Sequence, residues 1–293
     1  MKILIIGKNG QLGKSIKRIV SSKEQSDDFI FIDRNNLNLS QSENISQYFK
    51  KHSPDIIVNC AAYTAVDKAE SETELTNQIN NLAVKELATV AQKSNIKLIH
   101  ISTDYVFDGN NSQPYTETDK TNPINIYGKT KLAGEQSIQE IMPFNAIIIR
   151  TSWVYSEYGN NFVDTMLKLG KNRNELDIVS DQIGSPTYAS DLAGTILKIT
   201  KNKEFIETGQ STQVYHYSNT GECSWSEFAE EIFRLSKIQC TVNSITTEQY
   251  PTPAQRPKNT IMNKDKIIKR MGVKIPDWKH SLNTCITLLQ KKN

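Results

Sequence analysis

The sequence predicts an α/β protein with a doubly wound parallel sheet of the Rossmann type and a smaller C-terminal α/β part. Two observations predict this class. Short apolar runs alternate with amphipathic helical segments through the first half of the chain, and such alternation is typical of βαβ units with helices on both faces of a parallel sheet. After about Val154 the elements become shorter and are interrupted by Gly, Asn, Ser and Pro.

The expected strands are apolar runs that end in glycine or in a polar residue. Runs without alternation are typical of strands buried on both faces of a sheet. The first, KILIIG, starts at Lys2, and the remaining runs follow at intervals that leave room for a helix. In chain order they are Lys2–Gly7, Phe29–Asp33, Asp55–Ala61, Lys97–Ser102 and Ala146–Arg150.

The expected helices repeat apolar residues three or four positions apart, so that one face can pack against the sheet. In the first helix, from Gln11 to about Ser22, this face contains Leu12, Ile16 and Ile19. The other helices are expected at about Ser42–Lys51, Ser71–Ser94, Tyr127–Gln139, Ser190–Thr200 and Ser224–Ser236.

Composition excludes several classes of protein. The net charge of +3 is too small to predict nucleic-acid binding. No apolar run approaches the ~20 residues of a membrane span, and the first run is not a targeting signal. The four cysteines lie far apart with no metal-ligand or disulfide spacing, which is typical of free thiols. We therefore expect a cytoplasmic protein that binds neither nucleic acid nor membrane.

A glycine-rich turn follows the first strand. Gly7, Gly10 and Gly13 form G-x-x-G-x-x-G between the expected strand and helix. Glycines at these positions allow a tight turn, close approach of a pyrophosphate and close packing of helix on strand, and N–H groups at the helix start face the phosphates. This pattern predicts dinucleotide binding.

The residues at the end of the second strand give two opposite signals about the dinucleotide. Asp33 lies twenty residues after Gly13, where an acid bonds the adenosine ribose and favours NAD. Arg34 follows directly and can accommodate the 2′-phosphate of NADP. A solvated Asp–Arg pair is the alternative without function.

Tyr127 and Lys131 form Y-x-x-x-K at the start of an expected helix, so both side chains project from one face. A lysine cation about 4 Å from the phenol contributes roughly 4 kcal/mol at an effective dielectric of ~20. That interaction can lower the tyrosine pKa from near ~10 to about 7, the range of a useful acid–base group. Thr103 ends a neighbouring strand, at the edge of the sheet where ligands bind, and its hydroxyl can bond the same substrate oxygen. Without this context, a surface Tyr–Lys pair is the commoner explanation.

These motifs together resemble the extended short-chain dehydrogenase/reductase family, in its branch that reduces sugar nucleotides. The resemblance runs from residue 1 to about 260. It implies transfer of a hydride from NADPH, with NADH also accepted, to C4 of dTDP-4-dehydro-6-deoxy-L-mannose, giving dTDP-L-rhamnose. The matching segments are GKNGQLG, VNCAAYTAVDKAE, ISTDYVFDG, PINIYGKTKLAGEQ, RTSWVYSEYGNNF, DQIGSPT and YPTPAQRPKN.

The resemblance also implies roles for individual residues. Tyr127 would be the proton donor, Lys131 would also hold the nicotinamide ribose, and Thr103 would be the catalytic hydroxyl. The cofactor set comprises Gly7, Gly10, Gln11, Leu12, Gly13, Asp33, Arg34, Asn38, Leu39, Ala61, Ala62, Tyr63, Thr64, Tyr127 and Lys131. The expected contacts with the dTDP-sugar are Thr103, Asp104, Tyr105, Trp153, Asn161 and Arg256.

Several substrate-side residues keep a structural alternative. Trp153 can instead be a core residue, and Asn161 can merely turn the chain. Arg256 lies between prolines in a stiff loop and suits a diphosphate. We expect residues 1–155 with about 188–218 to form the dinucleotide-binding part, and residues 156–187 with 219–293 to form the sugar-nucleotide part.

Two features bear on assembly and on rival functions. Some relatives are dimers joined by a magnesium ion that is bound by acids, one of them in the first helix just after the glycine loop. Here no acid follows that loop until Glu24, so we expect no metal and leave monomer and homodimer open. A dehydratase would need an Asp–Glu pair where this chain has Asp104–Tyr105. Another sugar-nucleotide reductase or epimerase, and a non-catalytic subunit like the regulatory subunit of methionine adenosyltransferase, are the alternatives.

Overall fold

The computed structural model describes residues 1–22, 26–41, 43–207, 209 and 211–291. Its centre is a six-stranded sheet with the order β10-β5-β4-β3-β1-β2, in which every neighbouring pair is parallel. This architecture confirms the predicted fold class. The strands are β1 (Lys2–Ile6), β2 (Asp28–Ile32), β3 (Ile56–Asn59), β4 (Lys97–Thr103), β5 (Ala146–Thr151) and β10 (Gln213–Tyr217).

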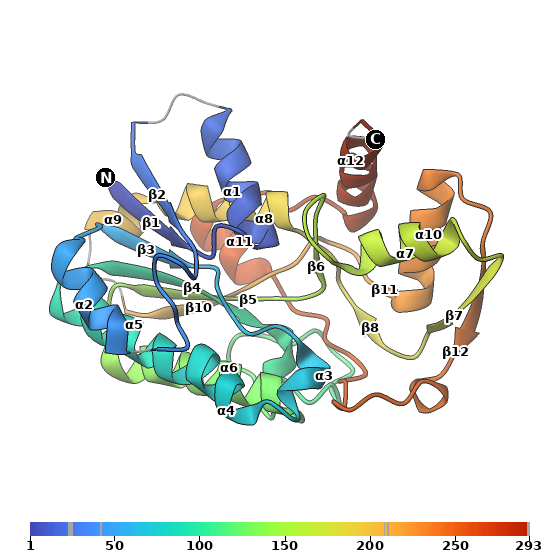
Figure 1. Ribbon diagram of the computed structural model, residues 1–293, viewed down its shortest axis with the longest axis horizontal. Helices are drawn as coiled ribbons and strands as arrows, with labels where there is room; N and C mark the ends of the chain where they lie inside the picture. The colour runs from blue at the N-terminus through green and yellow to red at the C-terminus, as the bar shows by residue number, and fades with distance from the viewer. Residues whose placement is uncertain (23–25, 42, 208, 210, 292–293) are drawn as a thin grey trace.

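Both faces of the sheet are buried under helices (Figure 1). Along β1, Ile3 and Ile5 belong to one apolar cluster, whereas Leu4 and Ile6 belong to another, because successive side chains of a strand point to opposite faces. Helices α1, α8 and α11 cover the first face, and α2, α5 and α6 cover the second. Their bounds are α1 (Gln11–Ser21), α2 (Glu43–Lys51), α5 (Ala83–Lys93), α6 (Ile126–Ile141), α8 (Ala189–Ile199) and α11 (Asp265–Met271).

The order of the strands reverses next to β1. β1 lies between β2 and β3, so the chain leaves β1 toward one edge of the sheet and then crosses to the other side. Loops that follow β1 and β3 therefore diverge, which opens a crevice at the carboxyl ends of these strands.

The long helix expected over residues 71–94 is divided in the structure. The chain forms α3 (Val66–Ala69), α4 (Thr73–Asn77), a π-helical turn over Gln78–Leu82 and then α5. The π turn contains Asn80, whose buried amide bonds the backbone of Tyr63: Tyr63 N donates to Oδ1 at 2.9 Å, and Nδ2 donates to Tyr63 O at 3.1 Å. A helix that must present one side chain to a neighbouring loop gains that freedom from a π turn.

The C-terminal elements form a second body with its own apolar cluster, on the right in Figure 1. Phe228, Trp278 and Leu282 are among its buried residues. The α9 helix (Lys203–Glu207) joins the cluster of the large sheet through Phe205. The remaining elements are β6 (Val154–Tyr155), α7 (Phe162–Gly170), β7 (Glu175–Val179), β8 (Ile183–Gly184), β9 (Thr187–Tyr188), β11 (Cys223–Ser224), α10 (Trp225–Ser236), β12 (Thr241–Ile245) and α12 (Trp278–Gln290).

Helix α11 lies late in the chain, in a segment that was expected to belong to the sugar-nucleotide part. Its Ile267 and Met271 nevertheless pack in the cluster of the large sheet. The proposed boundaries between the two parts stay a prediction.

Ser42, where a helix was expected to begin, and Glu24 lie outside the described residues. Among the described residues, no helix is long and apolar enough to cross a membrane.

Candidate active site

A cleft of about 850 Å³ lies at the carboxyl ends of the central strands, between the sheet and the C-terminal body. It collects residues that the sequence places more than 200 positions apart, from Gly7 to Trp225. A smaller cavity of about 90 Å³ adjoins it and is lined by Asn38 and Leu39. The expected site residues that line the cleft are Gly7, Gly10, Gln11, Leu12, Asp33, Arg34, Ala61, Ala62, Thr64, Thr103, Asp104, Tyr105, Tyr127, Lys131, Trp153 and Asn161.

Three expected site residues line neither the cleft nor the smaller cavity. Gly13 packs beneath the glycine loop. The Tyr63 side chain points to Glu72, donating from its hydroxyl to Oε2 at 2.7 Å. Arg256 is bound by Asp67, as described below. Their cofactor and substrate roles stay predictions.

The glycine loop has the geometry of a phosphate cradle. Gly7 has φ +94°, a left-handed conformation that favours glycine. A Cβ on Gly13 would lie 2.3 Å from Gly7 O, so only glycine lets α1 start this close to β1. Gly10, Gln11 and Leu12 at the start of α1 line the cleft, and a helix N-terminus attracts anions, so this cradle fits the pyrophosphate of a nicotinamide dinucleotide.

Two residues that sequence reasoning missed hold Asp33. Lys8 Nζ lies 3.1 Å from Asp33 Oδ2, and Asn9 Nδ2 donates to the same oxygen at 3.0 Å. The hydrogen bond from Lys8 is the main cause that holds the pKa of Asp33 below its usual value. Lys8 and Asn9 occupy the variable positions of the glycine motif, so the motif alone gave no signal for them.

Tyr127 lies in the first turn of α6, where the helix start is fixed by a cap. Asn125 is the cap residue, and its Oδ1 accepts from Gly128 N at 2.8 Å. The Tyr105 ring packs edge-on against the Tyr127 ring with centroids 5.7 Å apart. Burial raises the pKa of Tyr127 to about 12, although a hydrogen bond with Thr103 opposes that rise. The phenol therefore keeps its proton at neutral pH.

Lys131 lies one turn further along α6 and is almost fully buried, at 1% exposure. Its Nζ donates to Ile101 O at 2.7 Å and lies 3.2 Å from His100 Nε2. Burial lowers the pKa of Lys131 to about 8. The expected pKa near 7 for Tyr127 is not found, because burial raises the pKa of the phenol while Lys131 Nζ is directed to Ile101 and His100.

Asp104 is a buried acid in the cleft. Its Oδ1 accepts from Thr103 Oγ1 at 3.1 Å, and the carboxyl group is 2% exposed. Burial raises its pKa to about 6, against the opposing hydrogen bonds from Thr260 and Thr103. Its charge also raises the pKa of Tyr127.

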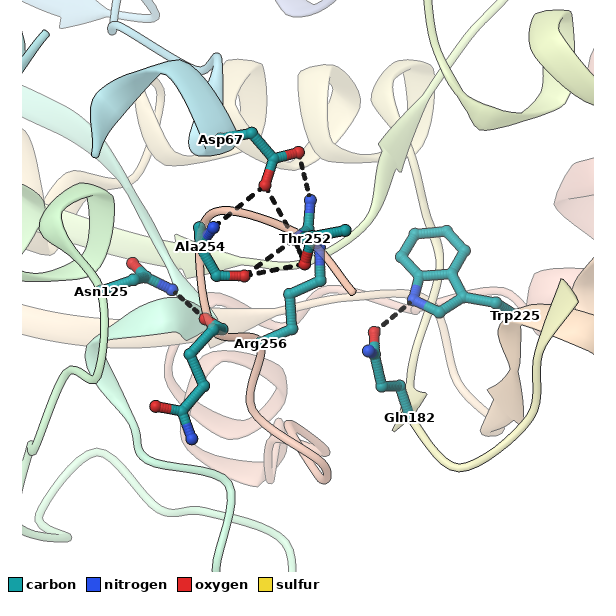
Figure 2. A network of polar contacts seen from close by, with 8 residues as sticks. Asp67, Asn125, Gln182, Trp225, Thr252, Ala254 and Arg256 are labelled. Atoms are coloured by element: carbon teal, nitrogen blue, oxygen red, sulfur yellow. Dashed lines mark hydrogen bonds and ion pairs between the residues drawn. The ribbon is translucent and has the colours of Figure 1, made fainter. Parts of the chain in front are cut away.

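The far wall of the cleft is aromatic. The indoles of Trp153 and Trp225 stack with centroids 3.5 Å apart and an interplanar angle of 10°. Trp225 Nε1 donates to Gln182 Oε1 at 3.2 Å (Figure 2). Trp153 has φ +48°, which is unusual for a bulky residue and marks an imposed geometry. Trp225 and Gln182 were not expected, because nothing local in the sequence connects them to Trp153.

Asn161 has a structural role as well as a place in the cleft. It caps α7, with Oδ1 accepting from Asp164 N at 3.1 Å. Its Nδ2 donates to Gln11 Oε1 at 3.1 Å, which ties the start of α7 to the start of α1. Asn161 therefore both shapes the chain, as the structural alternative predicted, and lines the cleft.

The loop around Arg256 is fastened to the N-terminal part of the chain (Figure 2). Arg256 Nη1 donates to Asp67 Oδ1 at 2.9 Å and Nη2 to Oδ2 at 2.7 Å. Nη1 also donates to Thr252 Oγ1 and Ala254 O, both on its own loop. The guanidinium that was expected to bind a diphosphate therefore has a carboxylate as its partner in this structure.

A dinucleotide cradle and a hydroxyl–phenol–amine set that line one cleft are the features of a nicotinamide-dependent oxidoreductase of the short-chain dehydrogenase/reductase type. Among the described residues, no group of three or more His, Cys, Asp or Glu side chains is placed to hold a metal. The geometry therefore defines the class, and comparison with known proteins identifies the family.

The family model described as "RmlD substrate binding domain" matches residues 1–291. A dTDP-4-dehydrorhamnose reductase of Sinorhizobium fredii is 38% identical over 293 residues, covering 99% of this chain and 98% of that protein. The crystal structure of a dTDP-4-dehydrorhamnose reductase from Clostridium acetobutylicum has a TM-score of 0.92 and 41% identity, covering 99% and 100% of the two chains. One from Bacillus anthracis, in complex with NADP, has a TM-score of 0.89 and 40% identity, covering 98% and 99%.

The chain therefore belongs to the dTDP-4-dehydrorhamnose reductase family. The match extends through the C-terminal body, beyond the region where sequence motifs carried the resemblance.

Proposed function

We propose that this protein reduces the C4 ketone of dTDP-4-dehydro-6-deoxy-L-mannose to give dTDP-L-rhamnose, using NADPH and also accepting NADH. One observation carries the proposal: Thr103, Tyr127 and Lys131 line the same cleft as the glycine loop. Membership of the family and a relative with bound NADP support the same reaction. The cytoplasm as its location, and a monomer or homodimer as its assembly, belong to this proposal.

Tyr127 would protonate the ketone oxygen as negative charge develops on it. A bound reduced nicotinamide supplies the hydride for this reaction. With a pKa of about 12 the phenol holds its proton at neutral pH, so the acid form needed for reduction is the form present. Transfer becomes favourable only when the oxygen acquires alkoxide character, which confines the step to the transition state.

Thr103 and Lys131 would support that transfer. The Thr103 hydroxyl lies beside Tyr127 and Asp104, where it supplies a second hydrogen-bonding group for the substrate oxygen. Lys131 would hold the nicotinamide ribose and balance the phenolate after proton transfer. Asp104, Tyr105, Trp153, Asn161 and Arg256 are proposed for the sugar and its diphosphate, with Arg256 exchanging Asp67 for phosphate oxygens.

The test is the loss of reduced-nicotinamide absorbance with dTDP-4-keto-6-deoxyglucose and the 3,5-epimerase that generates the L-lyxo keto-sugar. We expect oxidation that requires the epimerase and that is lost in Tyr127→Phe. This variant removes one hydroxyl and keeps the ring that packs on Tyr105, so it should fold, and titration with the cofactor separates loss of proton transfer from loss of binding.

Other outcomes would change the assignment. Oxidation without the epimerase would identify a reductase of a different deoxysugar. No oxidation by folded, cofactor-binding protein would refute the reductase and favour an epimerase or a regulatory subunit.

A further inference from the structure

A buried row of polar groups connects Lys131 to the carboxyl end of β3. Asn59 and His100 are partners across β3 and β4, and each is 0% exposed. Asn59 Nδ2 lies 3.1 Å from His100 Nδ1, and His100 Nε2 lies 3.2 Å from Lys131 Nζ. At the other end of the row, Ala61 N donates to Asn59 Oδ1 at 3.2 Å. The row has the lengths of hydrogen bonds throughout.

The backbone N–H of Ala61 determines which group donates and which accepts in every hydrogen bond of the row. A backbone N–H can only donate, so the Asn59 atom that faces Ala61 must be its oxygen. The amide NH₂ therefore faces His100 Nδ1 and donates to it. A ring nitrogen that accepts carries no proton, so the single proton of a neutral imidazole lies on Nε2. The ring is neutral, because burial lowers the pKa of His100 well below its usual value.

This proton on Nε2 points at the amino group of Lys131. An ammonium group has three donors and no acceptor, whereas a neutral amine has a lone pair that can accept. The same nitrogen donates to Ile101 O at 2.7 Å, which an amine also satisfies. The geometry is therefore complementary to a neutral Lys131. If Lys131 is charged, His100 Nε2–H faces an N–H group of the ammonium, and neither can accept.

We propose that Asn59 and His100 are positioning residues for Lys131: in the Nε2–H tautomer fixed by Asn59, His100 donates to the neutral amine of Lys131 and disfavours its charged form. This inference rests on the proposed function only for its effect on activity; the tautomer itself can be measured without any substrate. Because Ala61 also lines the cleft, the residue that sets the direction of the row belongs to the wall expected to meet the cofactor.

The surroundings of Lys131 agree with this role. Burial lowers the pKa of Lys131 to about 8, and the charge of Glu135 opposes that change. Glu135 is itself paired with Arg150 at 2.7 Å and bonded by Ser102, so its charge is largely compensated. A pKa of about 8 leaves Lys131 charged at neutral pH, so the cation proposed to balance the phenolate would be lost on the alkaline side.

The first experiment measures the His100 tautomer in the whole protein. Long-range proton–nitrogen NMR of histidine rings labelled with ¹⁵N distinguishes the two nitrogens, and the chain has only four histidines. His100→Gln identifies the His100 signals by their loss, and His280→Gln, at an exposed position, serves as the matched control. We expect a pyrrole-type Nε2 and a pyridine-type Nδ1 across neutral pH. A proton on Nδ1, or on both nitrogens, would overturn the proposal whatever the activity.

The second experiment reverses the row. In Asn59→Asp a carboxylate can accept from both Ala61 N and His100 Nδ1–H, which moves the ring proton to Nδ1 and leaves Nε2 to accept from a charged Lys131. The alkaline limb of kcat/KM for NADPH should then move up by about one pH unit or more, and the His100 spectrum should change tautomer. His100→Gln should move the limb in the same direction, while His280→Gln should leave it in place.

The two readouts separate this proposal from the function it rests on. Equal loss of activity at every pH in Asn59→Asp and His100→Gln, with an unchanged alkaline limb, would reduce both residues to core packing and refute the inference. If either variant fails to fold, the wild-type tautomer decides alone. Absence of activity in the wild type would refute the reductase and leave the tautomer measurement valid.

Discussion

Asp67 and Arg256 lie 189 positions apart in the chain and form a bidentate ion pair. The pair joins α3 to the loop that carries Thr252 and Ala254, and Ala254 N donates to the same carboxylate at 3.2 Å. The start of α6 is tied to the chain on each side of this pair: Asn125 Nδ2 donates to the neighbouring Gln255 O at 2.8 Å, and Ile126 N donates to Glu70 Oε1, just after α3, also at 2.8 Å. The position of Tyr127, next in the chain, thus depends on this junction.

Asp67→Asn should loosen the junction and lower the stability of the fold. The variant loses a charge-assisted fork that also satisfies a backbone N–H, so we expect the free energy of unfolding to fall by about 1 kcal/mol. Urea unfolding at low and high salt measures the change. The matched control is Asp164→Asn, which breaks an exposed pair between neighbouring turns with Lys168 and should cost only about 0.3–0.5 kcal/mol. Equal small losses in both variants would show that Asn125 holds the loop without the ion pair.

Gly184→Ala should displace the indole of Trp153. A Cβ at this position would lie 2.7 Å from Trp153 Cε2, and Trp225 stacked at 3.5 Å blocks escape on the other face. Crowding of this kind costs about 1–3 kcal/mol. We expect KM for the sugar nucleotide to rise about tenfold or more while the Kd for NADPH stays unchanged, measured by steady-state kinetics and cofactor titration.

Gly194→Ala is the control for that substitution. No atom lies within 4 Å of a Cβ at Gly194, which is an exposed position of α8. Alanine in a helix interior gains about 0.5–1 kcal/mol over glycine, so this variant should be slightly more stable and fully active. An unchanged substrate KM in Gly184→Ala would show that Trp153 does not meet the substrate.

Asp104 should make the fold less stable at neutral pH than at mildly acidic pH. Its folded-state pKa of about 6 lies above the ordinary 3.8, so the folded protein binds the proton more tightly than the unfolded chain. The contribution of Asp104 to the free energy of unfolding is therefore most favourable below about pH 4, falls between about pH 4 and pH 6, and stays low above about pH 6. By linkage the penalty at neutral pH is about 2–3 kcal/mol.

Asp104→Asn removes that penalty. We expect the variant to be more stable than the wild type at about pH 7.5, with a clearly smaller gain at about pH 4.5, by urea unfolding at both values. Its activity should be reduced. Asp108→Asn should instead be less stable than the wild type at both values, because hydrogen bonds from Asn110 and Asn122 hold the pKa of Asp108 below its usual 3.8 and its contribution is lost only at more acidic pH. A stability difference for Asp104→Asn that does not change with pH would contradict the assigned titration.

The strands and the glycine loop could be predicted because local sequence determines them. KILIIG is apolar without alternation, and its terminal glycine meets the conformational demand that the structure shows as φ +94° at Gly7. The contacts that tune the site could not be predicted in this way. Lys8 with Asp33, His100 with Lys131 and Trp153 with Trp225 are pairs that only the pairing of strands and the packing of two bodies bring together.

Lys8→Gln should change which nicotinamide the protein prefers. Asp33 alone repels a 2′-phosphate, but Lys8 at 3.1 Å offsets that charge, and Arg34 also lines the cleft. Removing the cation should lower kcat/KM for NADPH roughly five- to tenfold relative to NADH, the effect of about one screened charge pair, and should do so less at high salt. Asp33→Asn should shift the ratio toward NADPH, and Lys17→Gln, an exposed lysine of α1, should leave it unchanged. If Lys8→Gln lowers kcat/KM equally for NADPH and NADH, Lys8 supports the loop and does not select the nucleotide.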